Sequence, residues 1–335
     1  MKSKHLLVQL LAVSLAFPFM GTSAQAASIT IDVLEIFDYP GTGNQTRPQK
    51  INDHGEIVGI FVDSSGASRG FTRSRDGVFS PPIIEPNDTG NLTEGRGINN
   101  AATVCGDYLG SDGAFHGFFL SSGTFTEFDV PGATGTQVLG ISNAGDFSGA
   151  FLNSAGIFQA FISLGGSVMP IDIIPDATFS GAYQLNASNA FTGYYTDSGG
   201  INHGFFADKL GRLHFPIDPV DSIGTIFFGM NDKEWIVGRY SDSAGVTHGL
   251  FFVPPNDLVT YDFPGSTFTS LNGINAQGYV CGRYTDTAGI DHGFVGRVTR
   301  TRGEANNKVR LNSQPSTAKT IHQSPATLRS GPPAS

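Results

Sequence analysis

The composition of this 335-residue chain narrows the classes of fold and partner. Its formal net charge is −9 and only 15% of its residues are charged, against about 25% in average proteins, whereas 44 residues are glycine and 27 are phenylalanine. Between Ser28 and Val298 there are 12 basic and 28 acidic residues, a net charge of −16. This charge argues against a nucleic-acid partner, because phosphate binding needs a basic surface. Abundant glycine and phenylalanine favour short turns and aromatic strands over helices.

The N-terminus has the pattern of an export signal. Lys2 and Lys4 precede the apolar run Leu6–Met20, and small residues with "AQA" at Ala24–Ala26 follow it. This pattern predicts a signal peptide over residues 1–26 and therefore a secreted or periplasmic protein. No later stretch reaches about 18 apolar residues, so we expect no transmembrane segment.

Residues 28–298 contain six copies of one unit of about 44 residues. The glycine of a "VG" motif marks each copy, with steps of 47, 43, 44, 45 and 44 residues, at Gly59, Gly106, Gly149, Gly193, Gly238 and Gly282. A glycine or alanine after a "His" position and an Asn or Ser in a "GIN" motif recur with the same steps. Three markers in one register make the repeat secure, and a period of 40 to 50 residues is typical of a β-propeller blade.

Each unit predicts four short antiparallel strands. The first strand leads into "GIN", as at Leu271–Asn275, and the second contains the "VG" glycine. A hairpin such as "DSAGVT" at Asp242–Thr247 follows, with glycine where a left-handed turn residue is needed. The third strand begins at "HGF" and the fourth ends in "FD" or "ID", as in Thr126–Gly132.

The two ends of the array complement each other. The sixth unit stops after its third strand, near His292–Val298, while the mature N-terminus begins with an extra strand of the fourth kind in Ser28–Gly41. We therefore predict an all-β, six-bladed β-propeller of four-stranded antiparallel blades, with the last blade closed by the N-terminal strand. An open solenoid is the competing fold, but it would need capping repeats. The segment 299–335 is basic and rich in Ser, Pro, Thr, Asn and Gln, which predicts a disordered tail.

The repeat motifs resemble those of the bacterial extracellular family with His-Ala-Phe (HAF) repeats. The matching residues are "HGF" at His116, His203 and His292, "HGL" at His248, and "INxxG" at Ile51–Gly55 and Ile274–Gly278. The resemblance covers about residues 37–298 and implies export and repeated β structure, without a general biochemical function. The chain departs from the family by glycine in place of alanine and by Arg69 and Gln159 at two His positions.

A residue that recurs in most units is more plausibly structural than catalytic, because one active site needs one constellation. The His position holds Arg69, His116, Gln159, His203, His248 and His292. We expect these side chains to hydrogen-bond a turn carbonyl or an aspartate of the hairpin between the second and third strands. The hairpin series is Asp63, Asp112, Asn153, Asp197, Asp242 and Asp286, and the series that ends the fourth strand is Asp38, Glu85, Asp129, Asp172, Asp218 and Asp262.

Both acidic series should lie on one face of a propeller and make it negative. Such a face could attract Ca²⁺ or a polyhydroxylated ligand. The chain has no D-x-D-x-D-G calcium loop, so we predict no metal site and no cofactor, with Ca²⁺ the only cation considered.

Positions where the units differ are the better candidates for function. Three residues before the Asn of "GIN", in the innermost strand, the chain carries Gln49, Arg96, Leu139, Tyr183, Phe228 and Asn272. Gln49, Arg96, Tyr183, Phe228 and Asn272 are our candidate ligand-binding residues at the mouth of the central channel. The nearby Arg47 and Glu94 would add charge. Blade-to-blade packing is the alternative role.

Trp235 and Tyr279 are a second candidate pair. They occupy one repeat position, after the turn between the first and second strands, where four other units carry Glu56, Thr103, Asp146 and Ala190. The small and polar residues predict an exposed position, so the two aromatic rings would lie side by side and stack on a sugar or a partner.

Three further residues stand out. Cys105 and Cys281 share one repeat position in units that are not neighbours, so we predict two buried free thiols and no disulfide. Asp291 is the one residue of "DTAGIDHGF" that does not recur; its equivalents are Ser68, Phe115, Phe158, Asn202 and Thr247.

These patterns predict an exported propeller, expected to be monomeric, that acts as a binding module for glycan or cell-surface components. The alternative is a secreted polysaccharide lyase, glycosidase or lactonase with a site at the channel mouth. We find no G-x-S-x-G, H-E-x-x-H or phosphate-binding loop, and catalytic residues cannot be assigned from the sequence.

Overall fold

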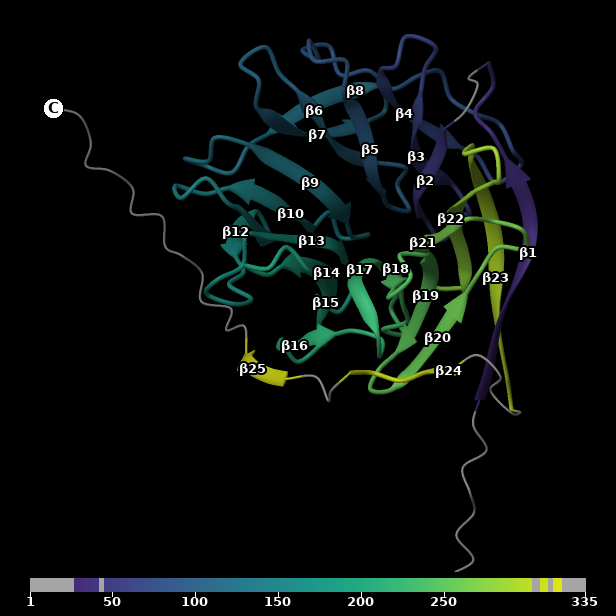
Figure 1. Ribbon diagram of the computed structural model, residues 1–335. Helices are drawn as coiled ribbons and strands as arrows, with labels where there is room; N and C mark the ends of the chain where they lie inside the picture. The colour runs from purple at the N-terminus through teal and green to yellow at the C-terminus, as the bar shows by residue number, and fades with distance from the viewer. Residues whose placement is uncertain (1–26, 42–44, 303–307, 313–315, 321–335) are drawn as a thin grey trace, which may run out of the picture.

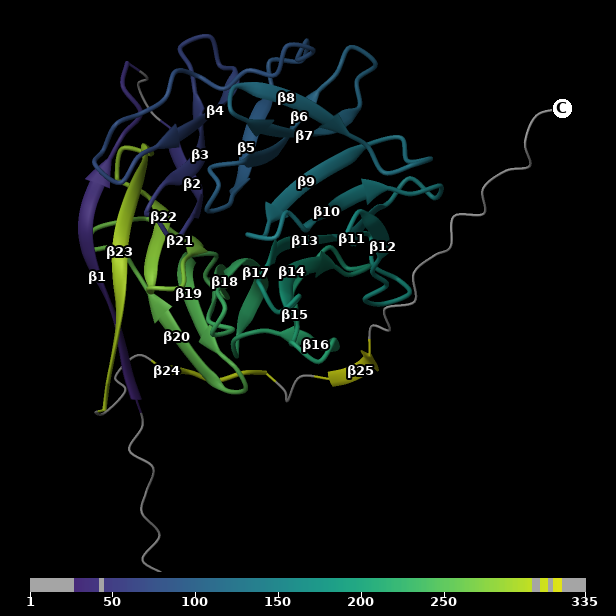
Figure 2. The same ribbon diagram turned by 180° about the vertical axis from the view of Figure 1, so that it is seen from behind.

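The computed structural model describes residues 27–41, 45–302, 308–312 and 316–320, and all the regular elements in these ranges are strands. The predicted signal peptide lies outside them. The described residues contain no helix of the length and apolarity that spanning a membrane requires. Figures 1 and 2 show the sheets arranged around a central axis, with the first strands innermost.

Antiparallel pairing groups the strands into sets that follow one another along the chain, and we call each set a blade. From the N-terminal side, the sets contain β2 (Thr46–Ile51), β3 (Ile57–Val62) and β4 (Ser68–Arg73); β5 (Thr93–Ile98), β6 (Val104–Leu109), β7 (Phe115–Ser121) and β8 (Thr124–Phe128); β9 (Thr136–Ile141), β10 (Phe147–Leu152), β11 (Phe158–Leu164) and β12 (Ser167–Pro170). They continue with β13 (Phe179–Leu185), β14 (Phe191–Thr196), β15 (Asn202–Ala207) and β16 (Arg212–Ile217); β17 (Ser222–Met230), β18 (Ile236–Asp242), β19 (Thr247–Val253) and β20 (Asp257–Tyr261); β21 (Phe268–Ile274), β22 (Tyr279–Thr285), β23 (Asp291–Arg302) and β1 (Ala27–Phe37).

Two features complicate this grouping. In the first blade, the place of a fourth strand is taken by two isolated bridges, Arg73 with Phe79 and Gly70 with Ile83. Elsewhere, single parallel residue pairs, Phe158 with Phe179 and Thr247 with Phe268, join neighbouring blades into longer sheets. The arrangement is nevertheless that of a β-propeller.

The repeated glycine and phenylalanine are cross-strand partners. Gly106 of β6 pairs with Phe118 of β7, and a Cβ atom on Gly106 would lie 2.7 Å from the Phe118 ring and still closer to the carbonyl oxygen of Glu94. The same pairing joins Gly59 with Phe71 and Gly282 with Phe294. The glycine lets the ring of the third strand lie flat against the second strand, where it is fully buried. Residues from adjacent blades then pack around these rings, as Val58 and Ile83 do around Phe118.

A ring of side-chain hydrogen bonds joins the blades near the axis. The Asn of each "GIN" motif donates through Nδ2 to the carbonyl oxygen of the equivalent residue in the next blade: Asn186 to Asn231 (3.1 Å), Asn231 to Asn275 (3.0 Å), Asn275 to Asn52 (3.0 Å), Asn52 to Asn99 (3.0 Å) and Asn99 to Ser142 (3.4 Å). The bond from Asn275 to Asn52 joins the last blade to the first, 223 residues apart. The recurring Asn, which marked only the register in the sequence, therefore links neighbouring blades.

The predicted closure by the N-terminal strand is confirmed. β1 pairs antiparallel with β23 from Ala27–Arg302 to Phe37–Gly293, with one irregularity between Val33 and Glu35. Figure 1 shows the purple β1 beside the yellow-green β23 on the outside of the last blade.

The prediction of a disordered tail from residue 299 is wrong for the part that the structure describes. β23 continues to Arg302, β24 (Lys308–Val309) pairs with β20, and β25 (Ser316–Thr320) pairs with β16 (Figures 1 and 2). Composition did not reveal this, because the pairing uses backbone groups that the outer strands of two blades leave free. The remainder of the predicted tail lies outside the described residues.

The prediction of two buried, free cysteines is confirmed. Cys105 and Cys281 are both free and fully buried, and burial raises the pKa of each thiol to about 12. They act as small core side chains in the second strands of their blades.

Closure by β1 leads to a stability prediction. Ile29 is 1% exposed and packs with Phe251, Phe294 and other residues of the last two blades, whereas Ile36 of the same strand is 50% exposed. We expect Ile29→Ala to lower the free energy of unfolding by about 2–4 kcal/mol, because it leaves a cavity in this cluster. Ile36→Ala, the matched control, should change it by less than about 0.5 kcal/mol. Equal effects of both substitutions in chemical denaturation would mean that β1 does not anchor the closed fold.

Candidate functional site

The His residues of the repeat bridge two aspartates on neighbouring strand ends. His248 Nδ1 lies 2.8 Å from a carboxylate oxygen of Asp262, and Nε2 lies 3.3 Å from Asp242. The same bridge recurs at His116 with Asp129 and Asp112, at His203 with Asp218 and Asp197, and at His292 with Asp38 and Asp286. Each of these imidazoles also stacks on a tyrosine, Tyr108, Tyr195, Tyr240 or Tyr284. This confirms the expected bond to the hairpin aspartate and adds a second partner.

The two units without His build similar links from other side chains. Gln159 donates to Asp172 at 2.6 Å and accepts from Asn153 at 3.4 Å. Arg69 contacts Asp63 at 3.4 Å and Asp88 at 2.9 Å, so Asp88 takes the place expected for Glu85. The hairpin aspartates also accept backbone N–H bonds; Asp242 Oδ1 accepts from Ala244 and Val246.

The bridges shift the pKa values of their members. Partial burial opposes protonation of His248 and His116, but hydrogen bonds to the aspartates outweigh it and raise the pKa of both imidazoles. The hydrogen bond that His203 donates to Asp218 raises the pKa of His203. Backbone hydrogen bonds, followed by the His contact, lower the pKa of Asp242 and Asp197. The bridges at His203 and His248 are therefore strongest when the imidazole is charged and the hairpin aspartate is ionised.

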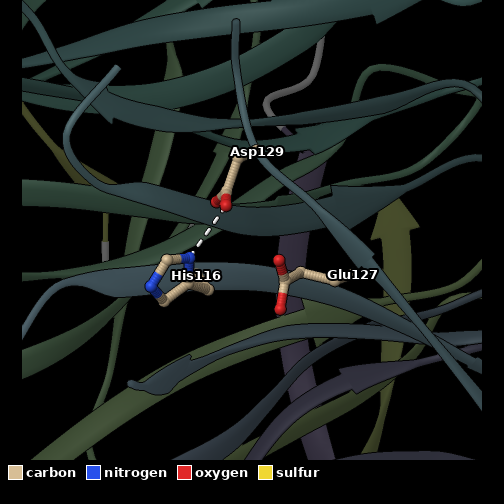
Figure 3. Close-up of side chains that lie close together, drawn as sticks. All are labelled: His116, Glu127 and Asp129. Atoms are coloured by element: carbon tan, nitrogen blue, oxygen red, sulfur yellow. Dashed lines mark hydrogen bonds and ion pairs between the residues drawn. The ribbon is translucent and has the colours of Figure 1, made fainter. Parts of the chain in front are cut away.

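One bridge has an additional carboxylate. Ligand atoms of His116, Glu127 and Asp129 lie within 4.8 Å of one another, a group that could hold a metal ion (Figure 3). However, both nitrogens of His116 are already bonded to Asp129 and Asp112, as they are in the units that lack an equivalent of Glu127. Glu127 in turn accepts a hydrogen bond from the Tyr108 hydroxyl. These contacts give the group a structural role like that of the other bridges.

The candidate residues of the innermost strands do come together. Gln49, Arg96, Tyr183, Phe228 and Asn272 all line one cavity of about 240 Å³ in the central channel. Arg47 and Glu94, expected to add charge there, line it as well. The Tyr183 and Phe228 rings meet edge to face, with centroids 5.5 Å apart. Asn272 is held by bonds to the Pro48 carbonyl oxygen and the Ser270 hydroxyl.

Ion pairs hold most of the charged side chains around this cavity. Arg96 contacts Asp107 at 2.9 Å and also pairs with Glu94. Burial raises the pKa of Asp107 above the ordinary value of an aspartate, although the adjacent guanidinium of Arg96 opposes that rise. Asp291 contacts Arg47 at 2.8 Å and Arg283 at 2.5 Å. The non-recurring aspartate therefore links the last blade to the first.

Arg239 is the exception in this cavity. Its guanidinium carbon lies 5.3 Å from the Phe228 ring centroid and 5.4 Å from that of Phe268, and it forms no ion pair with any residue in the described part of the chain. Burial lowers its pKa from the usual value for arginine. It offers N–H donors to the cavity without a competing carboxylate.

Most of the cavity residues that the sequence did not nominate occupy a single repeat position; the exception is Ile226 of β17. The residue after the "VG" glycine is Ile60, Asp107, Ala150, Tyr194, Arg239 or Arg283. Four of these line the cavity, and Asp107 contacts Arg96. This position varies as much as the innermost-strand position, so comparing the units there would have found it.

Trp235 and Tyr279 do not form the predicted exposed pair. Both are half-buried. Trp235 packs edge to face on Phe251, with ring centroids 5.6 Å apart, and Tyr279 belongs to a different hydrophobic cluster and lies beneath Arg297. The polar residues in the other units suggested exposure, but each of the larger rings packs into a hydrophobic cluster that its blade shares with the next blade.

The chain matches no protein-family model, and a search of curated proteins finds no relative. The resemblance to the HAF repeat family is therefore not confirmed. Among solved structures, a mutant of AofleA from Arthrobotrys oligospora has a TM-score of 0.50 at 11% identity, over 83% of this chain and 94% of that one. This likeness supports the propeller fold alone.

Two lectins overlap less well. BP39L lectin from Burkholderia pseudomallei has a TM-score of 0.44 at 12% identity, over 86% of this chain and 84% of that one. A mutant of the Aleuria aurantia lectin AAL, in complex with Fucα1-6GlcNAc, has a TM-score of 0.46 at 8% identity, over 82% and 97%.

The His bridges lead to a prediction with a pH dependence. His248→Ala should lower the free energy of unfolding by about 1–3 kcal/mol, because it removes two hydrogen bonds to charged groups. The pKa of His248 is raised in the folded protein. Its contribution to the free energy of unfolding is therefore complete below about pH 6.5 and is lost as the pH rises through the folded pKa. The pKa of Asp242 is lowered, so its contribution is lost as the pH falls from about 4 through the folded value. The loss measured by chemical denaturation should therefore be largest between about pH 4 and 6.5.

Gln159 provides the matched control for this experiment. His248→Gln reproduces the residue that bridges in the third blade, and it cannot titrate. It should retain more stability than the alanine variant at pH 8 and lose the additional stabilisation at pH 5. A ΔΔG for His248→Ala that is the same at pH 5 and pH 8 would contradict the assignment of a charged bridge.

Proposed function

We propose that the chain is an exported binding module, built on a closed ring of six blades, and that it binds a glycan in the cavity of the central channel. The observation that carries this proposal is the convergence of the non-repeating residues. Five positions chosen because the units differ there line one cavity with aromatic, amide and charged side chains. Propeller geometry alone brings equivalent positions of the innermost strands around the axis, so it is their mixture of aromatic, amide and charged side chains, which differs from blade to blade, that favours a ligand site.

The chemistry of the cavity suits a sugar. Phe228 and Tyr183 offer apolar ring surface, on which the C–H face of a sugar can pack. Gln49 and the unpaired Arg239 offer donors for ring hydroxyls, and Glu94 offers acceptor oxygens. A volume of about 240 Å³ accommodates about one sugar residue, so we infer recognition of a terminal sugar or one projecting branch.

We favour binding over catalysis for this cavity. Asp107 is the carboxyl group beside the cavity whose pKa is raised, but its side chain is fully buried and paired with Arg96. It therefore cannot reach a bound substrate to act as a general acid. A secreted lyase, glycosidase or lactonase remains the alternative, and release of product from a glycan substrate would identify it.

The remaining parts of the proposal concern location and assembly. We propose export to the periplasm or the medium, function as a monomer, and binding without a metal or another cofactor. These follow from the N-terminal sequence and from the structural role of the aspartates in the His bridges.

Loss of the aromatic surface should abolish binding at the channel. We expect Phe228→Ala and Tyr183→Ala each to weaken glycan binding about tenfold or more, because each removes a ring from a small, largely enclosed site. A panel of neutral and acidic oligosaccharides, followed by isothermal titration calorimetry of the hits, would measure this. Trp235→Ala is the control, because Trp235 is an aromatic residue outside the cavity and should leave the affinity unchanged. A neutral glycan whose affinity survives both cavity substitutions would place the site elsewhere.

Export gives a separate prediction. In a bacterial host the mature protein should begin close to Ser28, because "AQA" at Ala24–Ala26 is the predicted cleavage site. Cell fractionation and intact-mass measurement would test this. Full-length protein retained in the cytoplasm would refute the proposed location, and a substitution of Ala26 by a large residue should block processing.

A further inference from the structure

We propose that a cleft between the first and last blades is a second binding site, and that it takes an anionic ligand of the acidic-sugar class, in which a carboxylate adjoins a sugar ring. The inference does not depend on the channel site. The two cavities share no lining residue.

The cleft has a volume of about 560 Å³, more than twice that of the channel cavity. It lies near the turns between the first and second strands. Its walls come from β1, from β4 and the residues after it, and from β22 and β23. The lining residues used below are Leu34, Glu35, Arg73, Arg75, Tyr279 and Arg297.

Two arginines of the cleft have no acidic partner. Arg75 and Arg297 are both exposed, and neither forms an ion pair or side-chain hydrogen bond with the described residues. The Arg75 side chain lies against Gly55, and the Arg297 guanidinium lies over the Tyr279 ring, 5.4 Å from its centroid. Both positions leave N–H donors available to a ligand.

The third arginine is buried and incompletely bonded. The Arg73 side chain is 4% exposed, and its guanidinium carbon lies 4.5 Å from the Phe37 ring centroid. It pairs with Glu35, whose side chain is 47% exposed, but its buried Nε finds no partner. An unsatisfied buried N–H destabilises the unliganded protein, so its presence here favours a binding role.

The charges of the cleft do not cancel. Its carboxylates are Glu35 and Asp53. Glu35 forms an ion pair with Arg73, and Asp53 accepts hydrogen bonds from Asn100 and from the Ala276 backbone. The three arginines set against these two carboxylates leave the cleft with a net charge of +1. The whole chain has a net charge of −9, so this local positive charge favours an anionic ligand. The planar guanidinium group of arginine suits a carboxylate.

Part of the remaining wall of the cleft is apolar. The Tyr279 ring and the exposed Leu34, which is 56% accessible, border it together with Val295. Polar and apolar surfaces beside each other match a sugar ring that carries a carboxylate better than they match a small inorganic anion.

Calorimetric titration of the intact protein at about 50 mM NaCl, where surface charges are weakly screened, would test the site. The probes are D-glucuronate, D-glucose and inorganic phosphate. We expect glucuronate to bind, glucose to bind at least tenfold more weakly, and phosphate to bind more weakly than glucuronate. Higher salt should weaken glucuronate binding. No glucuronate binding, equal binding of glucose, or equal binding of phosphate would overturn the proposal.

Variants locate the site. Because both side chains are exposed, Arg75→Ala with Arg297→Ala should fold normally and weaken glucuronate binding about tenfold or more. Arg300→Ala, on the same strand but outside the cleft, should change it less than twofold. Arg75→Gln with Arg297→Gln repeats the test while keeping polar side chains, should the alanine variant be unstable. Phe228→Ala should leave glucuronate binding intact. Unchanged binding in either arginine double variant, or loss in Phe228→Ala, would refute the cleft as the site.

Discussion

The close contact between a glycine of the second strand and a phenylalanine of the third strand is the constraint on which the blades depend. At Gly106 even one methyl group would collide with the Phe118 ring and the neighbouring strand. The ring can therefore lie flat and present its other face to the adjacent blade. This contact recurs, with Leu250 in place of phenylalanine opposite Gly238, so these two positions have little freedom to vary. Variation is found at neighbouring positions of the first and second strands, where the channel cavity lies.

The success of the sequence-based predictions depended on whether a structural feature was repeated in the units. Strands, hairpins, closure by the N-terminal strand and the structural role of His248 followed from the register, because a periodic pattern reports what every unit must satisfy. The inner-strand residues Arg96 and Tyr183 were selected because the units differ at their position, and both line the channel cavity. Arg239 was missed because only one of the two variable positions was compared.

Other errors arose from interactions that no local pattern contains. Trp235 was expected to be exposed because polar residues fill its position elsewhere, but a large ring can fold back onto Phe251. The pairing of Ser316–Thr320 with β16 depends on free backbone groups at a sheet edge, which a polar composition does not exclude. The cleft between the first and last blades exists only once the ring has closed. The sequence therefore did not indicate that Arg73 and Arg75 lie near Arg297.

The pairing of β1 with β23 also determines when the protein can fold. Ala27 pairs with Arg302, so the first strand made has to wait for almost the whole described chain before it finds its partner. The bond from Asn275 to Asn52 is subject to the same delay. Until then β1 and the outer edge of the last blade are unpaired, and long-range pairing of this kind is slow. Closure thus links completion of the chain to completion of the fold.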